Sequence, residues 1–349
     1  MKRIAVIPGD GIGPEVIREA VRVLERVRLT HEVSLQLTDF DWGADRFLRD
    51  GVTLPEGALE MLAGEFDAIL AGAFGDPRVP SNKVAEDVLL GMRRGLDLYI
   101  NLRPVRLLDA RLSPLRDRTV AEIDFVVFRE NTEGAYCGAG GFLKKGTSEE
   151  IATQEELNTR KGVERIIVAA FEYARAKRRK RVTMADKSNV QRFGGDLWQR
   201  VFREVALRYP EIEANHQYAD AMTMFMVLDP GQYEVIVSNN LFGDILTDLG
   251  AAIVGGLGLA ASGNIHPGRV SLFEPVHGSA PPLAGKGIAN PIGAILTAAM
   301  MLEYLGFKSA SEAIEAAVCQ SIVHHETTRD LGGSLSTIEA GAAICNRIG

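Results

Sequence analysis

Cysteines are few in this chain, and long hydrophobic runs are missing. Its 349 residues include 3 cysteines, and Cys137, Cys319 and Cys345 show no CxxC spacing, so we expect neither a disulfide framework nor a zinc site. The nearest candidate for a membrane span, residues 251–261, is too short and too rich in glycine. Met1–Pro8 leads directly into a predicted strand without the pattern of a signal peptide. These absences favour a cytoplasmic protein with no membrane partner.

Excess positive charge is also lacking, because the formal net charge is -7 at pH 7. Such a field does not favour binding to nucleic acid or to an anionic membrane. The one basic run, residues 177–181, closes an amphipathic helical pattern, where cations complement the negative helix end. With 46% hydrophobic and 24% charged residues, the chain suits a soluble enzyme of two domains or one large α/β unit.

Short apolar runs alternate with segments of helical periodicity along the chain. The predicted strands are residues 4–7, 68–70, 125–128, 182–184 and 235–237, and the predicted helices are residues 14–27, 84–98, 163–174 and 291–305. This alternation is typical of an α/β fold with a largely parallel sheet. Residues 136–154 interrupt it with a polar, glycine-rich stretch, which we interpret as an active-site lid or as a hairpin arm that reaches a partner subunit.

The glycine-rich turn Gly9–Gly13 joins the first strand to the first helix. Its G-x-G-x-G spacing differs from the G-x-G-x-x-G dinucleotide fingerprint, and no acidic residue ends a clear second strand about 20 residues later. We therefore do not expect a conventional Rossmann fold. The glycines still allow the backbone to approach a cofactor closely.

The segment Asn239–Asp248 carries the strongest chemical signal. It follows a predicted strand, and Asn239 or Asn240 is a suitable N-cap for a helix. On that helix Asp244 and Asp248 are four residues apart, so both carboxylates share one face. A cation relieves their repulsion, and carboxylate oxygens suit Mg²⁺ or Mn²⁺. The alternative is a solvated acidic helix face, which the many apolar neighbours disfavour.

Four arginines stand out by their context: Arg93 lies on a predicted helix and Arg129 at the end of a predicted strand, while Arg103 lies in the motif Asn-Leu-Arg-Pro and is followed by Arg106. Guanidinium groups bind carboxylates in bidentate geometry. Several of them near a divalent cation therefore predict a substrate with more than one carboxylate. For any single arginine, a surface ion pair is the structural alternative.

Further candidates follow the other predicted strands. Lys187 comes after the strand at 182–184, where a nearby cation makes it a candidate proton acceptor. Asp220 offers a third carboxylate, and Tyr136 is a candidate proton donor. His277 lies in a loop whose backbone N–H groups suit a nucleotide.

Together these motifs resemble the metal-dependent, β-decarboxylating 2-hydroxyacid dehydrogenases, which include the isopropylmalate, isocitrate, homoisocitrate, tartrate and D-malate dehydrogenases. The resemblance runs nearly from end to end through seven ordered blocks at residues 9–15, 101–104, 129–134, 186–189, 240–248, 274–281 and 285–291. It implies the α/β isopropylmalate/isocitrate dehydrogenase-like fold, with one domain of residues 1–99 plus 253–349 and a second of residues 100–252. It also implies a homodimer in which each active site is completed by the neighbouring subunit.

The resemblance further implies roles for the candidate residues. Arg93, Arg103 and Arg129 would bind the substrate carboxylates. Asp244 and Asp248 of one subunit, with Asp220 of the other, would hold Mg²⁺ or Mn²⁺. Lys187 of the partner would accept the C2 hydroxyl proton, and Tyr136 would protonate the enol carbon. NAD would contact Ile12, Glu274, His277, Gly278, Ser279, Ala280 and Asn290.

The cofactor block departs from the family pattern at one position. Members that use NAD generally carry an aspartate just after His-Gly-Ser-Ala-Pro, whereas this chain has Pro282 and Leu283. The chain also lacks a Lys-Tyr pair for the 2′-phosphate of NADP. NAD is therefore the expected cofactor, and NADP is the alternative.

The predicted helix before the first arginine bears on the substrate. Glu86, Leu89 and Leu90 stand where isopropylmalate dehydrogenases carry an acidic residue and two leucines. By the same resemblance, Asn189 and Val190 of the partner would complete the pocket. Two leucines bury an isopropyl group, worth about 2 kcal/mol, and would leave an extra carboxylate unpaired. We therefore expect 3-isopropylmalate to be converted to 4-methyl-2-oxopentanoate and CO₂, as in leucine biosynthesis.

Two blocks favour other branches of the family. Residues 129–134 read Arg-Glu-Asn-Thr-Glu-Gly, as in the isocitrate, tartrate and malate enzymes, and residues 290–293 resemble the tartrate branch. Tartrate or D-malate dehydrogenase is the main alternative, followed by homoisocitrate dehydrogenase. A catalytically silent regulatory homologue is the non-enzyme alternative, and the presence of every expected metal ligand and proton carrier disfavours it.

Overall fold

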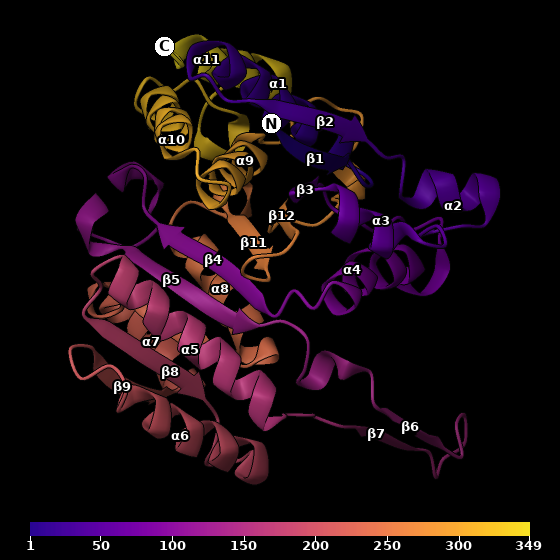
Figure 1. The fold of residues 1–349 in the computed structure, drawn as a ribbon, viewed down its shortest axis with the longest axis vertical. Coiled ribbons are helices and arrows are strands. Elements are labelled where there is room, and N and C mark those ends of the chain that lie inside the picture. Colours follow the sequence, from indigo (N-terminus) through magenta and orange to yellow (C-terminus); the bar gives the residue numbers. More distant parts are fainter. The chain divides into compact units, whose positions relative to one another are not determined.

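The computed structural model describes all residues from Met1 to Gly349, and the chain divides into two compact units (Figure 1). Unit 1 comprises Met1–Leu98, Arg106–Val120 and Ala251–Gly349, and unit 2 comprises Tyr99–Val105 and Ala121–Gly250. Residues 106–120, which the sequence analysis placed in the central domain, belong to unit 1. None of the helices combines the length and the apolarity needed to cross a bilayer.

Unit 1 contains strands in the order β2-β1-β3-β12-β11. They are β1 (Lys2–Ile7), β2 (Leu35–Asp39), β3 (Ala68–Ala71), β11 (Ala261–Ile265) and β12 (Ser271–Pro275). All neighbours pair in parallel except β11, which is antiparallel to β12. Strand β2 ends in an acidic residue, Asp39. The prediction that no acidic residue ends a clear second strand was therefore wrong. The edge strand β2 buries only Leu35 and therefore shows no apolar run.

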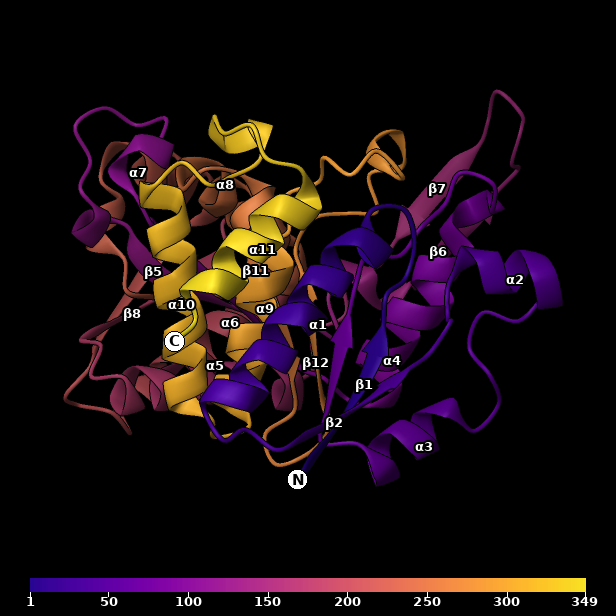
Figure 2. The same cartoon turned by 90° about the horizontal axis from the view of Figure 1, so that it is seen from above.

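The helices of unit 1 cover its strands. They are α1 (Gly13–Thr30), α2 (Ala44–Asp50), α3 (Ala58–Glu65), α4 (Gly91–Gly95), α9 (Ile292–Tyr304), α10 (Lys308–Val323) and α11 (Thr337–Arg347). Helices α1, α9, α10 and α11 pack against one another (Figure 2). The predicted helix at 84–98 is instead a π-helix, Ala85–Leu90, which continues into α4 and ends at Gly95. Its Val88 is buried in a core that includes Ile7, Ile69 and Met92.

Unit 2 contains strands in the order β4-β5-β10-β8-β9. They are β4 (Ile100–Arg106), β5 (Asp124–Glu130), β8 (Arg181–Asp186), β9 (Glu213–Tyr218) and β10 (Val235–Ser238). Strand β10 is parallel to β5 and β8, and β8 is parallel to β9. The carboxyl ends of these four strands therefore lie at one edge, where α/β proteins commonly bind ligands. The α/β class expected from the sequence is confirmed.

Four helices and a hairpin complete unit 2. The helices are α5 (Arg160–Ala176), α6 (Arg192–Ala206), α7 (Ala219–Leu228) and α8 (Asn240–Ile253). Helices α5 and α6 pack together, and α7 contacts β8 and β9. The polar stretch forms an antiparallel hairpin of β6 (Gly140–Leu143) and β7 (Ile151–Gln154), whose side chains are all exposed. The hairpin projects as an arm (Figures 1 and 2).

Candidate active site

The main polar cluster of unit 2 lies where β5 and β10 end. In their parallel register Ser238 pairs with Arg129, so the start of α8 lies beside the end of β5. Asn239 caps α8, because its Oδ1 accepts a hydrogen bond from the Phe242 N–H at 2.9 Å. Of the two N-cap candidates in the sequence, Asn239 fills this role, and Asn240 is left for another.

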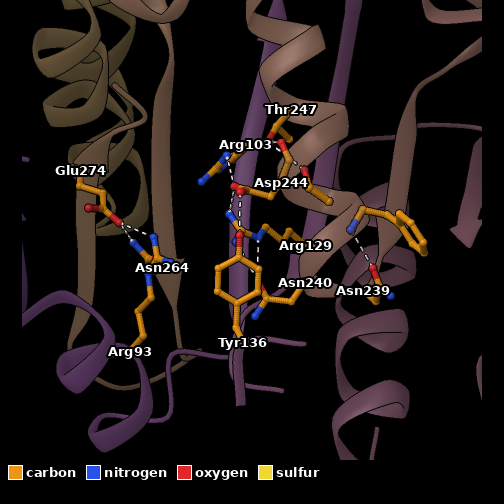
Figure 3. Close-up of polar contacts among 12 residues, drawn as sticks. Arg93, Arg103, Arg129, Tyr136, Asn239, Asn240, Asp244, Thr247, Asn264 and Glu274 are labelled. Carbon is orange, nitrogen blue, oxygen red and sulfur yellow. Dashed lines mark hydrogen bonds and ion pairs between the residues drawn. The ribbon is translucent and has the colours of Figure 1, made fainter. Parts of the chain in front are cut away.

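Arg129 is held on one edge by a neutral amide and at its tip by a carboxylate (Figure 3). Its Nε and Nη2 donate to Asn240 Oδ1 at 3.0 Å and 2.7 Å, and its Nη1 donates to Asp244. The side chain is 2% exposed. Gly243 makes room for it, because a Cβ at that position would lie 2.7 Å from both Cβ and Cγ of Arg129.

Asp244 is the meeting point of the cluster (Figure 3). Its Oδ1 also accepts from Arg103 Nη1 at 3.3 Å, and its Oδ2 accepts from the Tyr136 hydroxyl at 2.9 Å. Arg103 donates in turn to Thr247 Oγ1 at 2.7 Å. Partial burial and the neighbouring Asp244 raise the pKa of the Tyr136 phenol above its usual value. The phenol is therefore kept protonated at neutral pH, as a proton donor requires.

Asp248 lies one turn further along α8, at the surface. Partial desolvation and the charge of Asp244 raise the pKa of its carboxyl. Within one chain, no group of three or more His, Cys, Asp or Glu side chains is placed to hold a metal ion. The hard oxygens of Asp244 and Asp248 are of the kind that a divalent cation prefers.

Lys187 and Asp220 form a separate pair at the ends of β8 and β9. These strands are parallel, with Asp186 opposite Tyr218, so the residues that follow them are neighbours. Lys187 Nζ lies 2.5 Å from Asp220 Oδ2, and this hydrogen bond lowers the pKa of the Asp220 carboxyl. Asp220 is largely exposed, and so are the adjacent predicted residues Asn189 and Val190.

In unit 1, Arg93 is paired with Glu274 (Figure 3). Arg93 Nη2 donates to Glu274 Oε1 at 2.8 Å, and Asn264 Nδ2 donates to the same oxygen at 2.9 Å. All three side chains are buried. Glu274 is also a residue expected to contact the cofactor, and in this structure its carboxylate binds Arg93. The Arg93 Nε is buried without a hydrogen-bond partner, as expected for a group that binds an added anion.

The loop after β12 contacts the glycine-rich turn. The Ile12 N–H donates to the Ser279 carbonyl at 2.8 Å, and a Cβ at Gly11 would lie 2.0 Å from that oxygen. His277 Nδ1 lies 3.0 Å from the Gly278 carbonyl, while its Nε2 is buried without a partner. Desolvation lowers the pKa of His277, so the ring is neutral and Nε2 is an acceptor that a nucleotide base can satisfy.

Asn290, another residue predicted to contact the cofactor, forms hydrogen bonds within the chain. Asn290 donates to Asp330 at 2.9 Å and accepts from the Ile292 N–H at 3.0 Å, so both ends of its amide have protein partners. Ala280 adopts a left-handed φ of 40°, a strained conformation that is often found at binding sites. Pro282 lies in the short 3₁₀ helix Pro281–Leu283 and offers no hydrogen-bonding side chain.

The predicted specificity residues lie on the π-helix. Leu89 and Leu90 are half-buried, and Glu86 is exposed. Asp87 accepts from Thr53 Oγ1 and pairs with Lys83, both at 2.7 Å. Burial raises the pKa of the Asp87 carboxyl, but the hydrogen bonds from Lys83 and Thr53 outweigh this effect, and the pKa is lowered overall. The carboxylate of Asp87 therefore already has protein partners and is not available to a ligand. Arg106 forms a surface ion pair with Glu315 at 2.9 Å, which is the structural alternative for a single arginine.

The comparisons with known proteins cover nearly the whole chain. Residues 3–344 match the model of the family described as isocitrate/isopropylmalate dehydrogenase. The chain belongs to this family. The resemblance inferred from the seven sequence blocks is therefore confirmed, together with the fold that it implied.

Relatives of this chain in the isocitrate/isopropylmalate dehydrogenase family carry two different names. The 3-isopropylmalate dehydrogenase of Thermobifida fusca is 47% identical over 99% of this chain and 97% of its own length. The 3-isopropylmalate dehydrogenase of Corynebacterium diphtheriae is 49% identical over 98% of each chain. The solved structure of isocitrate dehydrogenase from Methylococcus capsulatus has a TM-score of 0.90 and 38% identity, and the match covers 100% of this chain and 99% of that one.

Sequence reasoning found most of the polar residues but missed several that hold them. Asn240, Thr247 and Asn264 were not assigned a role beyond a possible helix cap, although each donates to or accepts from a predicted site residue. The available signal was spacing, since Asn240 lies four residues before Asp244 and so shares its helix face. No comparable local signal marked Asn264, whose contacts come from distant parts of the chain.

Proposed function

We propose that the chain is a metal-dependent dehydrogenase that oxidises 3-isopropylmalate with NAD and releases CO₂ and 4-methyl-2-oxopentanoate. The observation that carries the reaction class is the convergence of Arg103, Arg129 and Tyr136 on Asp244. It combines carboxylate-binding cations, a protonated phenol and a metal-ligating oxygen in one place. The extensive identity with enzymes named 3-isopropylmalate dehydrogenase supports the substrate.

The donor atoms fit Mg²⁺ or Mn²⁺. Asp244 and Asp248 present carboxylates on one face of α8. Desolvation and, after it, the charge of Asp244 raise the pKa of Asp248, and a bound cation would relieve the repulsion between the two carboxylates. When bound, such a cation stabilises negative charge on the C2 oxygen of the substrate. Because one chain lacks a third ligand beside these two, we propose that Asp220 of a second copy completes the set.

The chain's own residues supply the proton transfers and the substrate contacts. Lys187 would accept the proton of the C2 hydroxyl as a neutral amine, so it must first leave the carboxylate of Asp220 and release its own proton to solvent. Tyr136 would deliver a proton to the carbon that loses CO₂, since its phenol is protonated and its hydroxyl reaches the cluster at Asp244. Arg129 and Arg103 would then exchange part of their contact with Asp244 for the substrate carboxylates.

A homodimer is proposed because unit 2 exposes apolar side chains on the elements next to these residues. Helices α7 and α8 leave Met224, Leu228 and Ile245 exposed, each with about half of its surface or more accessible. The arm likewise exposes Phe142 and Leu143. Exposed apolar surface of this kind is typical of a subunit interface. Joining two copies there would cover it and bring Lys187 and Asp220 to the neighbour.

Selectivity for the alkyl group is assigned to the π-helix. Leu89 and Leu90 supply an apolar wall, and Asp87 cannot receive a further acidic group because it is charged and occupied by Thr53 and Lys83. NAD is the proposed cofactor. The unpartnered Nε2 of His277 and the close approach of Gly11 to Ser279 fit an adenosine group. Pro282 withholds the acidic contact to the ribose that the family uses, so we expect weak discrimination between NAD and NADP.

The test is NADH or NADPH formation with Mg²⁺ and 3-isopropylmalate, isocitrate, D-malate or tartrate as substrate. We expect 3-isopropylmalate with NAD to give the highest kcat/KM. Tartrate or D-malate dehydrogenase is the second candidate, since residues 129–134 and 290–293 resemble those branches of the family. Isocitrate is included because the solved isocitrate dehydrogenase matches the whole chain. Faster turnover of isocitrate, D-malate or tartrate would overturn the substrate assignment. Reduced cofactor from none of the four would overturn the enzyme assignment.

A further inference from the structure

Asn240 uses its side chain to link two parts of the polar cluster. Its Oδ1 accepts from Arg129 Nε and Nη2 at 3.0 Å and 2.7 Å, and its Nδ2 donates to the Glu133 carbonyl at 3.1 Å. Asn240 and Arg129 are each 2% exposed, so bulk solvent has little access to these contacts, and removing one partner leaves buried polar groups unsatisfied. The carboxamide of Asn240 therefore accepts hydrogen bonds from Arg129, a candidate for substrate binding, and donates one to the loop at Glu133.

The acceptor end fixes the direction of Arg129. A guanidinium group is planar, so holding Nε and Nη2 along one edge sets the plane of the whole fork. Gly243 lies against the aliphatic part of the Arg129 side chain. The plane of the guanidinium group is thus set before any ligand arrives, which reduces the entropy lost on binding.

The donor end fixes the loop that carries Tyr136. Glu133 is followed by Gly134, whose φ of 77° needs glycine and whose Cβ position would be 3.3 Å from Asn240 Cβ. The Glu133 carboxylate also accepts from the Thr159 N–H at 2.8 Å. Tyr136 lies two residues after Gly134, and its hydroxyl reaches Asp244 at 2.9 Å. The loop therefore starts from a point that Asn240 holds.

We propose that Asn240 is a positioning residue that sets Arg129 for the substrate carboxylate and sets the Glu133–Tyr136 loop for proton delivery. It acts through these groups and does not itself contact the substrate. The inference rests on the proposed dehydrogenase function. The two ends of the Asn240 carboxamide have different roles. The acceptor oxygen supports substrate binding through Arg129, and the donor nitrogen supports the chemical step through the loop that carries Tyr136.

Two variants test the two ends separately. Asn240→Ala removes both contacts, so we expect the KM for 3-isopropylmalate to rise and kcat to fall, each by about tenfold or more. Asn240→Asp keeps acceptor oxygens for Arg129 but loses the donor to the Glu133 carbonyl. We expect its KM to stay within about threefold of the wild-type value while kcat falls by about tenfold. Assays use saturating Mg²⁺, because the new carboxylate lies one turn from Asp244.

A double-mutant cycle distinguishes positioning from general damage to the fold. If Asn240 acts through Arg129, the effect of Asn240→Ala on KM is largely lost in an Arg129→Lys background. Asn239→Ser is the matched control, since serine keeps the helix cap and only the contact of Asn239 with Glu156 is removed. It should leave kcat and KM within about twofold of wild type.

Three results would overturn the inference. They are additive effects of Asn240→Ala and Arg129→Lys, an Asn240→Asp variant with the same loss in KM as Asn240→Ala, and an Asn239→Ser variant as impaired as Asn240→Ala. Circular dichroism and thermal melts confirm that each variant is folded. An inactive wild-type protein would instead refute the proposed function, so the two failures are distinguishable.

Discussion

Replacing Gly243 by alanine tests how tightly Arg129 is held in the cluster. A Cβ at this position would lie 2.7 Å from Cβ and Cγ of Arg129 and 3.3 Å from its Cα. An ordinary carbon contact needs about 3.5–4.0 Å, so one group must move by about 1 Å. Arg129 is 2% exposed and is bonded on two sides by Asn240 and Asp244, which leaves it no room for an easy shift.

The size of the effect follows from two opposing contributions to stability. Alanine in a helix interior gains about 1 kcal/mol over glycine, while overpacking a buried site costs about 1–3 kcal/mol. The net loss in unfolding free energy is therefore at most about 2 kcal/mol, and the protein still folds. A misplacement of about 1 Å in a group that positions substrate lowers the rate by about a hundredfold. We therefore expect a large loss of kcat/KM with a small loss of stability.

The assay measures kcat/KM from NADH formation, and urea unfolding gives the free energy of unfolding. Gly64→Ala in α3 is the control, since nothing lies within 4 Å of its Cβ position. That variant should gain about 0.5–1 kcal/mol in stability and keep wild-type activity. A Gly243→Ala enzyme with wild-type kcat/KM would show that Arg129 is not held as described.

Three further changes have defined outcomes. Leu89→Ser should lower kcat/KM for 3-isopropylmalate more than for D-malate, by about tenfold or more, and equal losses for both would refute the apolar pocket. Mn²⁺ at about a hundred times its Kd should stabilise the wild type by about 2.7 kcal/mol, seen as a higher Tm, whereas a similar rise for Asp244→Asn would exclude that ligand. Burial and a 2.6 Å hydrogen bond to Glu172 raise the pKa of Tyr209 from 10.0 to about 12. The folded state thus holds this proton more tightly, and the stabilising contribution is complete below pH 10 and lost as the pH rises towards 12. Urea unfolding across this range should show the advantage of wild type over Tyr209→Phe shrinking, and a constant difference would contradict the assignment.

Elements with a strong local pattern could be predicted from the sequence. The strand Val235–Ser238 and the helix that Asn239 caps follow from an apolar run and a capping residue, both of which depend on neighbours in the chain. The i, i+4 relation of Asp244 and Asp248 holds for the same reason. Such features need no knowledge of tertiary contacts.

Features set by distant contacts were missed or misread. The π-helix Ala85–Leu90 adds a residue to a turn, and its apolar spacing looks like that of an ordinary helix. The contacts of Glu274 with Arg93 and Asn264 were missed, because they join residues from distant parts of the chain, while its expected contact with the cofactor stays a prediction. The pairing of Lys187 with Asp220 likewise depends on the parallel register of β8 and β9.

Subunit complementation tests the central claim most directly, namely that each site takes Lys187 and Asp220 from one copy and Asp244 and Asp248 from the other. Lys187→Ala and Asp244→Asn are each expected to be inactive with 3-isopropylmalate, NAD and Mg²⁺. After unfolding, mixing in equal amounts and refolding, half of the dimers pair one variant with the other, and each of these has one intact site. The mixture should therefore recover about a quarter of wild-type activity. Activity no greater than that of the separate variants would contradict a site shared between subunits.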